Sequence, residues 1–437
     1  MLNLATMQDV RAVSRHLPLL SLAAAACVLI LVSGASAHGI LQYSSPTAGT
    51  VLPSAPDRLE LRFNESIDPQ LSAVVLVREN RRIPLALRAA NGPRLSYTLP
   101  PLEPGLYMVD WRVISTVDGH LARGAFAFGV GEVTLPAGTV EAAGPAWFEV
   151  AVRWTGLVGV LVLVGGAVMF MALPAPEAAV PALRVRLHRL AIVAAAAITV
   201  AGLFRVFIDA AAITGGTSLL GASGWSLLRV LAASHSGHDL VFRATGAIFM
   251  VSLLRPALPL ERGGAGTVLG VLLIGPTLTS HGLSVGLGGV AIGLAHLIAA
   301  SIWIGGLAFF GTAYLPVVRA AAPDIVWPAA LRFSRLALVS LGVLMLTGFL
   351  QGWLFVGSPA ALTGSFYGQT LLVKLIVVAP LLALAAMNRW GVLPRTATAG
   401  SSWRSLLILV RLETALGLVV ALLAAAIAIS QPVITGR

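Results

Sequence analysis

The sequence predicts an N-terminal all-β sandwich domain followed by an α-helical membrane bundle of about eight transmembrane helices. Three observations predict this fold class. The chain has 437 residues, of which 57% are hydrophobic and only 11% are charged, and its mean hydropathy is +0.89. Short alternating segments occupy residues 38–132, and long apolar runs begin at residue 147. Since a soluble globular chain carries roughly 25% charged residues, most of this protein is expected to lie in lipid.

Residues 1–37 have the features of a secretory signal peptide. A basic stretch with Arg11 and Arg15 precedes the apolar segment 17–32, and residues 35–37 (Ala-Ser-Ala) form a small-residue cleavage site. The alternative is an anchor helix that is not removed. We expect cleavage and export of the domain that follows.

Cleavage after Ala37 makes His38 the first residue of the mature chain. Such a histidine offers a metal ion two nitrogen atoms, the free α-amine and the imidazole, which together close a chelate ring. The single cysteine, Cys27, lies inside the signal segment. The mature chain is therefore expected to have no disulfide and no thiolate ligand.

Residues 38–132 predict an antiparallel β-sandwich. Segments in which apolar and polar residues alternate are separated by clusters of Pro, Gly and Asn, a pattern typical of strands and turns. About seven short strands are expected. Residues 133–146, rich in Gly, Pro, Ala and Val, predict a linker. The clearest strand segments are 59–63, 73–78, 94–99, 106–113 and 124–130.

Residues 147–437 predict the membrane domain. Its apolar runs approach or exceed the ~20 residues that span a bilayer, although the third run is short. Backbone polar groups cannot stay unpaired in lipid, so these runs are expected to be helices. The eight runs are 147–172, 188–210, 240–255, 264–282, 287–312, 333–356, 368–390 and 405–429.

The arginines between these runs predict the orientation of the bundle. If the β-domain is exported, the connections alternate between the outer and the inner side, and the inner ones carry nearly all the arginines. Arg229 is the clear exception. This distribution follows the positive-inside rule and indicates a bacterial inner-membrane protein. The arginines of the inner connections are Arg184, Arg186, Arg189, Arg255, Arg262, Arg319, Arg332, Arg335, Arg389, Arg395 and Arg404.

Two classes of function are not expected. The formal net charge of +11 does not indicate a nucleic-acid-binding protein, because the basic residues are spread over short loops and form no compact patch. The sequence contains no P-loop and no Asp-Lys-Thr-Gly phosphorylation motif, so ATP-driven pumping is not expected either.

The histidines gather on the predicted outer side. His16 lies in the signal segment and His188 in a basic inner loop, whereas the other six fall in the β-domain, in outer loops or in the outer part of the membrane. Imidazole is a common ligand of transition metals, and an ionisable residue inside the bilayer is a candidate for function. For His235, His238 and His281, an ordinary position in a loop or at the membrane interface remains the alternative. The six are His38, His120, His235, His238, His281 and His296.

The β-domain contains a candidate metal site. Asp118 and His120 are two residues apart, so on an extended segment they project to the same face. With His38 they supply two imidazoles, one amine and one carboxylate, a set that suits Cu(II). Glu65 is a further candidate ligand, with an exposed strand-end acid as the alternative. Because the domain has one methionine, Met108, and no cysteine, a sulfur-built Cu(I) site is not expected there.

Charged residues inside the predicted helices call for partners. Arg205 and Asp209 are four residues apart near the outer end of the second run and are expected to pair. Lys374, in the seventh run, is expected either to extend toward the interface or to pair with a carboxylate.

The fifth run combines His296 with Trp303, Gly305 and Gly306. His296 and Trp303 are seven residues apart and are expected to share a helix face. The two glycines would let a neighbouring helix come close. Plain helix packing is the alternative reading for Trp303 and for both glycines.

The N-terminal domain resembles the periplasmic copper-binding family CopC. The resemblance covers nearly all of residues 38–130 and implies an Ig-like or cupredoxin-like sandwich. It also implies a Cu(II) site built from His38, Asp118 and His120, with Glu65 matching a carboxylate that only some members use. The methionine-rich loop of other members is missing. The matching segments are His38-Gly-Ile-Leu, Leu61-Arg-Phe-Asn-Glu65, Gly105-Leu-Tyr-Met-Val-Asp-Trp111, Asp118-Gly-His120 and Phe126-Ala-Phe128.

The membrane domain resembles the CopD family over most of residues 150–395. The whole chain is thus similar to fused CopC–CopD copper homeostasis proteins, which implies copper import across the inner membrane. The matching segments are His296-Leu-Ile-Ala-Ala-Ser-Ile-Trp303-Ile-Gly305-Gly306, Arg332-Phe-Ser334, Thr347-Gly348, Tyr367-Gly368, Leu371-Leu-Val-Lys374 and Asn388-Arg389.

These observations predict capture of copper outside the cell membrane and its transfer inward. Cu(II) is expected to bind in the β-domain and to pass, as Cu(I) or Cu(II), to the outer histidines 235, 238 and 281 and then to His296. Expected partners are the copper ion, the lipid bilayer, and periplasmic copper donors or cytoplasmic copper acceptors. No enzymatic activity is expected.

Two other functions stay open at the level of sequence. The β-domain could buffer copper while the helices only anchor it. The protein could also be a copper- or haem-dependent membrane oxidoreductase, because an N-terminal histidine chelates copper in some oxidative enzymes and a bundle with histidines can bind haem.

Overall fold

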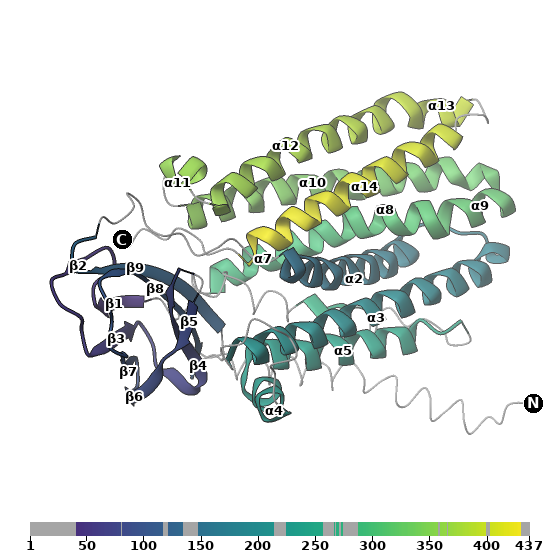
Figure 1. Ribbon diagram of the computed structural model, residues 1–437. Coiled ribbons are helices and arrows are strands. Elements are labelled where there is room, and N and C mark those ends of the chain that lie inside the picture. The colour runs from purple at the N-terminus through teal and green to yellow at the C-terminus, as the bar shows by residue number, and fades with distance from the viewer. Residues whose placement is uncertain are drawn as a thin grey trace, which may run out of the picture. The chain divides into compact units, whose positions relative to one another are not determined.

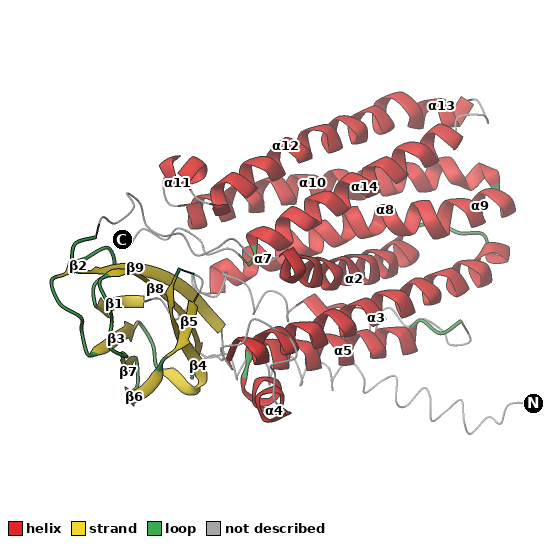
Figure 2. Cartoon of the chain, in the orientation of Figure 1, coloured by secondary structure: helices red, strands yellow, loops and turns green. Residues whose placement is uncertain are grey.

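A computed structural model describes residues 41–79, 81–116, 121–133, 147–213, 224–256, 266, 268–270, 272–273, 287–356, 359–364, 366–398 and 403–429 (Figure 1). Strands occupy the described chain before residue 131, and helices occupy it from residue 147 onward (Figure 2). This order agrees with the predicted fold class. The β-domain (residues 41–133) and the helical domain (residues 147–429) are described separately.

The β-domain consists of two sheets. One has the strand order β1-β3-β7-β6 and the other β2-β9-β8-β4-β5. All pairings are antiparallel except that of β2 with β9. The strands are β1 (Leu41–Ser45), β2 (Val51–Leu52), β3 (Arg58–Phe63), β4 (Ile67–Arg78), β5 (Arg81–Pro84), β6 (Ala86–Asn91), β7 (Arg94–Thr98), β8 (Gly105–Ser115) and β9 (Leu121–Val130).

The alternation seen in the sequence places one face of each sheet in a shared core. On β3, Leu59, Leu61 and Phe63 are buried, while the residues between them face outward. Strand β8 buries every second residue in the same way, from Tyr107 to Val113. Burial of each large apolar side chain contributes about 1.5–3 kcal/mol, so this core holds the two sheets together.

Trp111 lies at the centre of this core. Its ring packs edge-on against Phe63, with 5.2 Å between the ring centroids. Across the ladder it pairs with Gly124, where an added Cβ would collide with the indole ring. The absence of a side chain at Gly124 is therefore what admits the tryptophan.

The helical domain contains long helices joined by short helical turns. Three turns have π-helical geometry: Ser301–Gly305, Phe310–Tyr314 and Met387–Val392. Two short turns, Glu177–Ala179 and Pro323–Ile325, are 3₁₀. The helices are α2 (Trp147–Ala172), α3 (Val180–Ile213), α4 (Gly224–Ala233), α5 (His235–Leu253), α7 (Leu287–Ala300), α8 (Gly306–Phe309), α9 (Leu315–Ala321), α10 (Val326–Val356), α11 (Pro359–Gly364), α12 (Phe366–Ala386), α13 (Leu393–Thr398) and α14 (Trp403–Ile427).

Six helical segments of the described chain are long and apolar enough to cross a membrane. The third predicted run corresponds to α5, which is not among the six, and most of the fourth run lies outside the described residues. A multi-pass membrane domain is therefore supported, and the number eight stays a prediction. The six segments are Trp147–Ala172, Glu177–Ala211, Leu287–Ala321, Pro323–Val356, Phe366–Arg395 and Trp403–Ile427.

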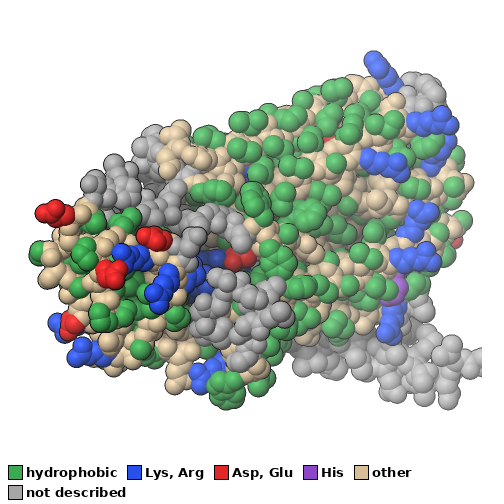
Figure 3. Space-filling view, viewed as in Figure 1, with side chains coloured by type: hydrophobic (Ala, Val, Ile, Leu, Met, Phe, Trp, Pro, Cys, Tyr) green, Lys and Arg blue, Asp and Glu red, His purple; other side chains and the backbone are tan. Residues whose placement is uncertain are grey.

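Arginines gather at one end of these spans. Figure 3 shows Lys and Arg side chains at the end where α9 and α13 lie. Away from that end, hydrophobic side chains cover the helices. We call this the arginine-rich end, defined by residues 184–189, 319–335 and 389–404. His188 lies here within α3, which begins at Val180, so its assignment to a loop was wrong. The helix continues past the apolar run because three arginines can extend their charges into water from a helical end.

Candidate metal-binding and transport residues

Three predicted ligands of the β-domain, His38, Asp118 and His120, lie outside the described residues. The described positions next to them are informative. Strand β1 starts at Leu41, which pairs with Phe63 at the end of β3. The first described residue after His38 is therefore close to the segment that holds Glu65.

The other two ligands belong to the connection between β8 and β9. Ser115, at the end of β8, pairs with Ile67 at the start of β4. The backbone N–H of Thr116 donates to the carbonyl of Ser66 at 2.9 Å, one residue after the partly buried Glu65. The described neighbours of all four candidate ligands thus converge at one end of the sandwich.

The outer histidines of the helical domain are only partly described. His281 lies outside the described residues, and so does the side chain of His235, whose backbone begins α5. His238 is exposed in the first turns of α5, and its Nε2 lies 3.0 Å from the carbonyl oxygen of Ala232. A carbonyl only accepts, so Nε2 is the donor in this hydrogen bond.

His296 lies in α7, about 14 Å along the helix from its start at Leu287. Its Nδ1 is 2.9 Å from the hydroxyl oxygen of Thr347 on α10. That hydroxyl also lies 2.6 Å from the carbonyl of Val343, to which it must donate. The hydroxyl therefore accepts from His296, so Nδ1 carries the proton and Nε2 keeps the lone pair that can bind a metal.

The surroundings of this ring suit a transient cargo. Nε2 of His296 makes no hydrogen bond to any described residue. Gly348 follows Thr347 and leaves the space beside Cε1 free of a side chain, since an added Cβ would come within 3.7 Å of that atom. Lys374, on α12, is near enough to His296 for the two side chains to interact electrostatically.

No group of three or more His, Cys, Asp or Glu side chains able to hold a metal occurs within the described part of the chain. His296 is therefore not part of such a group among the described residues. Met345, one of the methionines of the membrane domain, is 57% exposed on the outside of α10 and does not approach the packed interior.

Trp303, Gly305 and Gly306 bring α7 and its π-helical turn against α2. Trp303 is buried. A Cβ at Gly305 would collide with the carbonyl oxygen of Leu161, and one at Gly306 would lie 3.0 Å from the ring of Phe333. The glycines thus permit helix contact at backbone distance, which is a packing role.

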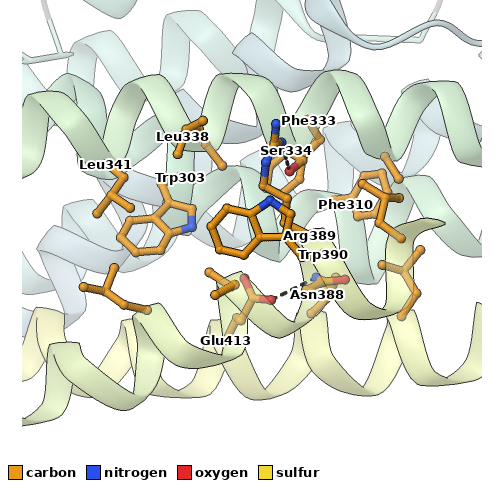
Figure 4. A pocket seen from close by; sticks show the side chains of 18 residues that line it. Trp303, Phe310, Phe333, Ser334, Leu338, Leu341, Asn388, Arg389, Trp390 and Glu413 are labelled. Atoms are coloured by element: carbon orange, nitrogen blue, oxygen red, sulfur yellow. Dashed lines mark hydrogen bonds between the residues drawn. The ribbon is translucent and has the colours of Figure 1, made fainter. Parts of the chain in front are cut away.

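A cavity of about 290 Å³ lies between α10, α12 and α14 on the side of the arginine-rich end (Figure 4). Trp303, seven residues beyond His296, lines it, and all three π-helical turns contribute to its wall. Two hydrogen bonds cross it. Asn388 Nδ2 donates to Glu413 Oε1 at 2.9 Å, and Arg389 donates to Ser334 Oγ at 2.7 Å.

Glu413 was missed as a candidate site residue, although the sequence carried a signal for it. It is a carboxylate within the apolar run 405–429, and it is only 3% exposed. Asn388, Arg389 and Ser334 all belong to segments that resemble CopD. Their spacing in the sequence does not predict that Asn388 contacts Glu413 or that Arg389 contacts Ser334.

Family comparisons divide the chain in two. Residues 41–131 match the model of the CopC domain, and residues 327–427 match that of copper resistance protein D, CopD. The second match includes Thr347, Asn388 and Glu413 but begins after His296.

Individual proteins match as well. The copper transport protein CutJ of Bacillus subtilis (strain 168) is 26% identical over 383 residues, which cover 80% of this chain and 68% of CutJ. Copper resistance protein C of Pseudomonas syringae pv. tomato is 36% identical over 112 residues, covering 23% of this chain and 87% of that protein. The crystal structure of CopC from Methylosinus trichosporium OB3b covers 23% of this chain and all of its own, with 27% identity and a TM-score of 0.21.

Proposed function

Because the chain belongs to the family of proteins that fuse a CopC domain to a CopD domain, we propose that it binds Cu(II) outside the cytoplasm and imports copper across the bacterial inner membrane. Copper is its cargo. The β-domain lies on the periplasmic side in this proposal, and the arginine-rich end faces the cytoplasm.

Capture uses the end of the sandwich where β1 starts and β8 joins β9. His38 precedes Leu41 by three residues in the sequence. Asp118 and His120 follow Thr116 within four residues, and Glu65 directly precedes Ser66, whose carbonyl accepts from the backbone N–H of Thr116. One amine, two imidazoles and one or two carboxylates make a nitrogen- and oxygen-rich set that favours Cu(II).

Transfer uses the histidines of the helical domain. His235, His238 and His281 are proposed to receive the ion at the outer face, as Cu(I) or Cu(II), and His296 to receive it inside the bundle. The observation that carries this step is the chain of hydrogen bonds from His296 to Thr347 to the carbonyl of Val343. It fixes the tautomer that leaves Nε2 able to bind metal, a role that a packing histidine does not need.

The copper content of cells tests this function. Cells that produce the protein are expected to accumulate more copper than cells that lack it. His296→Ala should reduce accumulation to the level without the protein, whereas His188→Ala, at the arginine-rich end, should not. Unchanged accumulation by His296→Ala at normal protein level would contradict import and favour a copper-buffering module with a membrane anchor.

The absorption spectrum of the purified protein tests the enzymatic alternative. We propose that the protein is not an oxidoreductase and that periplasmic copper donors or cytoplasmic copper acceptors are its further partners. The purified protein should show no Soret absorption. A Soret band would indicate haem in the bundle and would contradict the assignment of its histidines to copper.

A further inference from the structure

Glu413 is a carboxylate buried inside a membrane span. It lies ten residues after the start of α14, about 15 Å along the helix from the arginine-rich end, and it is 3% exposed. An ionised carboxylate at such a depth is costly unless a partner compensates its charge. The identity of its partners therefore decides what Glu413 does.

The partner of Glu413 is a neutral amide. Asn388 Nδ2 donates to its Oε1 at 2.9 Å. The neighbouring cation, Arg389, donates instead to Ser334 and makes no ion pair with Glu413 among the described residues. Asp209 provides the contrast, because this carboxylate is 2% exposed but lies 3.2 Å from the guanidinium of Arg205, the pair that the sequence predicts.

An amide suits a carboxyl group that changes its protonation state. Asn388 can donate through Nδ2 to an ionised carboxylate and can accept through Oδ1 from a protonated one. In the structure Oδ1 is buried and makes no hydrogen bond to a described residue. This oxygen can therefore accept a hydrogen bond from Glu413 when its carboxyl group is protonated. An arginine partner has no acceptor and could not do so.

The ionisable groups around Glu413 are few. Helix α14 packs against α2, α8, α12 and the three π-helical turns. Of the ionisable residues on these elements, only Arg389 shares the cavity with Glu413. The others are Glu149 and Arg153 on α2, Tyr367 and Lys374 on α12, and Tyr314 on the turn Phe310–Tyr314.

The lining of the cavity includes residues from the helical segment that follows His296 and from the arginine-rich end, while His296 itself does not line it. Trp303, from the helix of His296, lines one part, and Arg389 of the arginine-rich end lines another. Its volume of about 290 Å³ exceeds that of a water molecule, whose share of the liquid is about 30 Å³. With Ser334, Asn388, Arg389 and Glu413 as polar partners in its wall, the cavity has room for water beside the carboxylate.

From this geometry we propose that Glu413 is a proton-binding site that controls the release of copper from the membrane domain. The proposal rests on the proposed copper transport. In its ionised form Glu413 attracts the cation from His296 toward the cavity through a low-dielectric interior. When a hydronium ion in the cavity transfers its proton to the carboxylate, an O–H bond of the hydronium breaks, the carboxyl O–H bond forms and a water molecule remains, so the negative charge disappears and the cation leaves. The carboxyl group then returns the proton to water, which forms hydronium again, before the next ion arrives.

Copper uptake into vesicles with a controlled internal pH tests this role. The full chain is reconstituted with its arginine-rich end facing the lumen, and uptake of isotopic copper is measured while the lumen pH varies and the outer pH stays constant. Uptake by the unaltered protein should depend on lumen pH. Glu413→Gln should lose that dependence, and Glu413→Asp, which keeps a titratable group, should retain it in shifted form.

The outcomes separate this proposal from copper transport itself. Asp209→Asn removes the carboxylate that is already paired, so it should leave the dependence on lumen pH intact. Transport by Glu413→Gln with an unchanged dependence would overturn the role of Glu413 and leave import standing. If Glu413→Gln does not fold, Glu413→Asp provides the test. Uptake by Glu413→Asp with the same dependence on lumen pH as the unaltered protein would also overturn the role of Glu413. Absence of uptake by the unaltered protein would overturn both.

Discussion

The β-domain and the helical domain offer copper two different environments. In the β-domain, candidate ligands come from three separate segments whose described neighbours meet at one end of a rigid sandwich. In the helical domain, the described path has one imidazole supported by one hydroxyl, with a lysine nearby. In the proposed function this difference corresponds to tight capture by several ligands outside and a weak, transient hold inside.

Blocking the α-amine of His38 should have the largest effect of the changes considered, because it removes a proposed ligand from the β-domain and so reduces the difference between the two domains. A form that keeps one extra residue before His38 loses the amine ligand, so its affinity for Cu(II) should fall by at least about 100-fold. Titration of the full chain with Cu(II) measures this. A form with a substitution at His188, at the arginine-rich end, is the control and should keep the affinity. Equal affinity of the extended and mature forms would remove His38 from the site.

Thr347→Val should weaken copper transfer in the helical domain without affecting the β-domain. The variant keeps the shape of the side chain but removes the hydroxyl that orients His296, and loss of such a supporting hydrogen bond costs about 10–100-fold in metal affinity. Copper uptake should fall accordingly while Cu(II) binding by the β-domain is unchanged. Thr347→Ser keeps the hydroxyl and should keep uptake. Normal uptake by Thr347→Val would mean that the tautomer of His296 does not matter.

Gly124→Ala should have the smallest effect on copper, because it acts on the core and not on a ligand. The added methyl group collides with Trp111 and should destabilise the β-domain by about 1–3 kcal/mol. Faster hydrogen exchange of the β8 and β9 amides in the full chain would measure this. Gly352→Ala, on α10, meets no atom within 4 Å and serves as the control. Unchanged exchange in Gly124→Ala would contradict the packing of Trp111.

The two regions also differ in how far the sequence predicts them. The five predicted strand segments are confirmed as parts of β3, β4, β7, β8 and β9, and in β3 and β8 the buried residues alternate as the pattern predicts. Strand β6 was not among them since all six of its residues are exposed and leave no alternation to detect. The long helices follow from their apolar runs, but their polar contacts do not. His296 and Thr347 are 51 residues apart, and Asn388 and Glu413 are 25 apart, so only the packing of helices brings them together.

Uptake of isotopic copper into membrane vesicles of known orientation tests the central claim most directly. Vesicles whose β-domain faces outward should accumulate copper, and the same vesicles with His296→Ala should not. Accumulation that is equal in both, or that occurs only in inverted vesicles, would contradict import through His296.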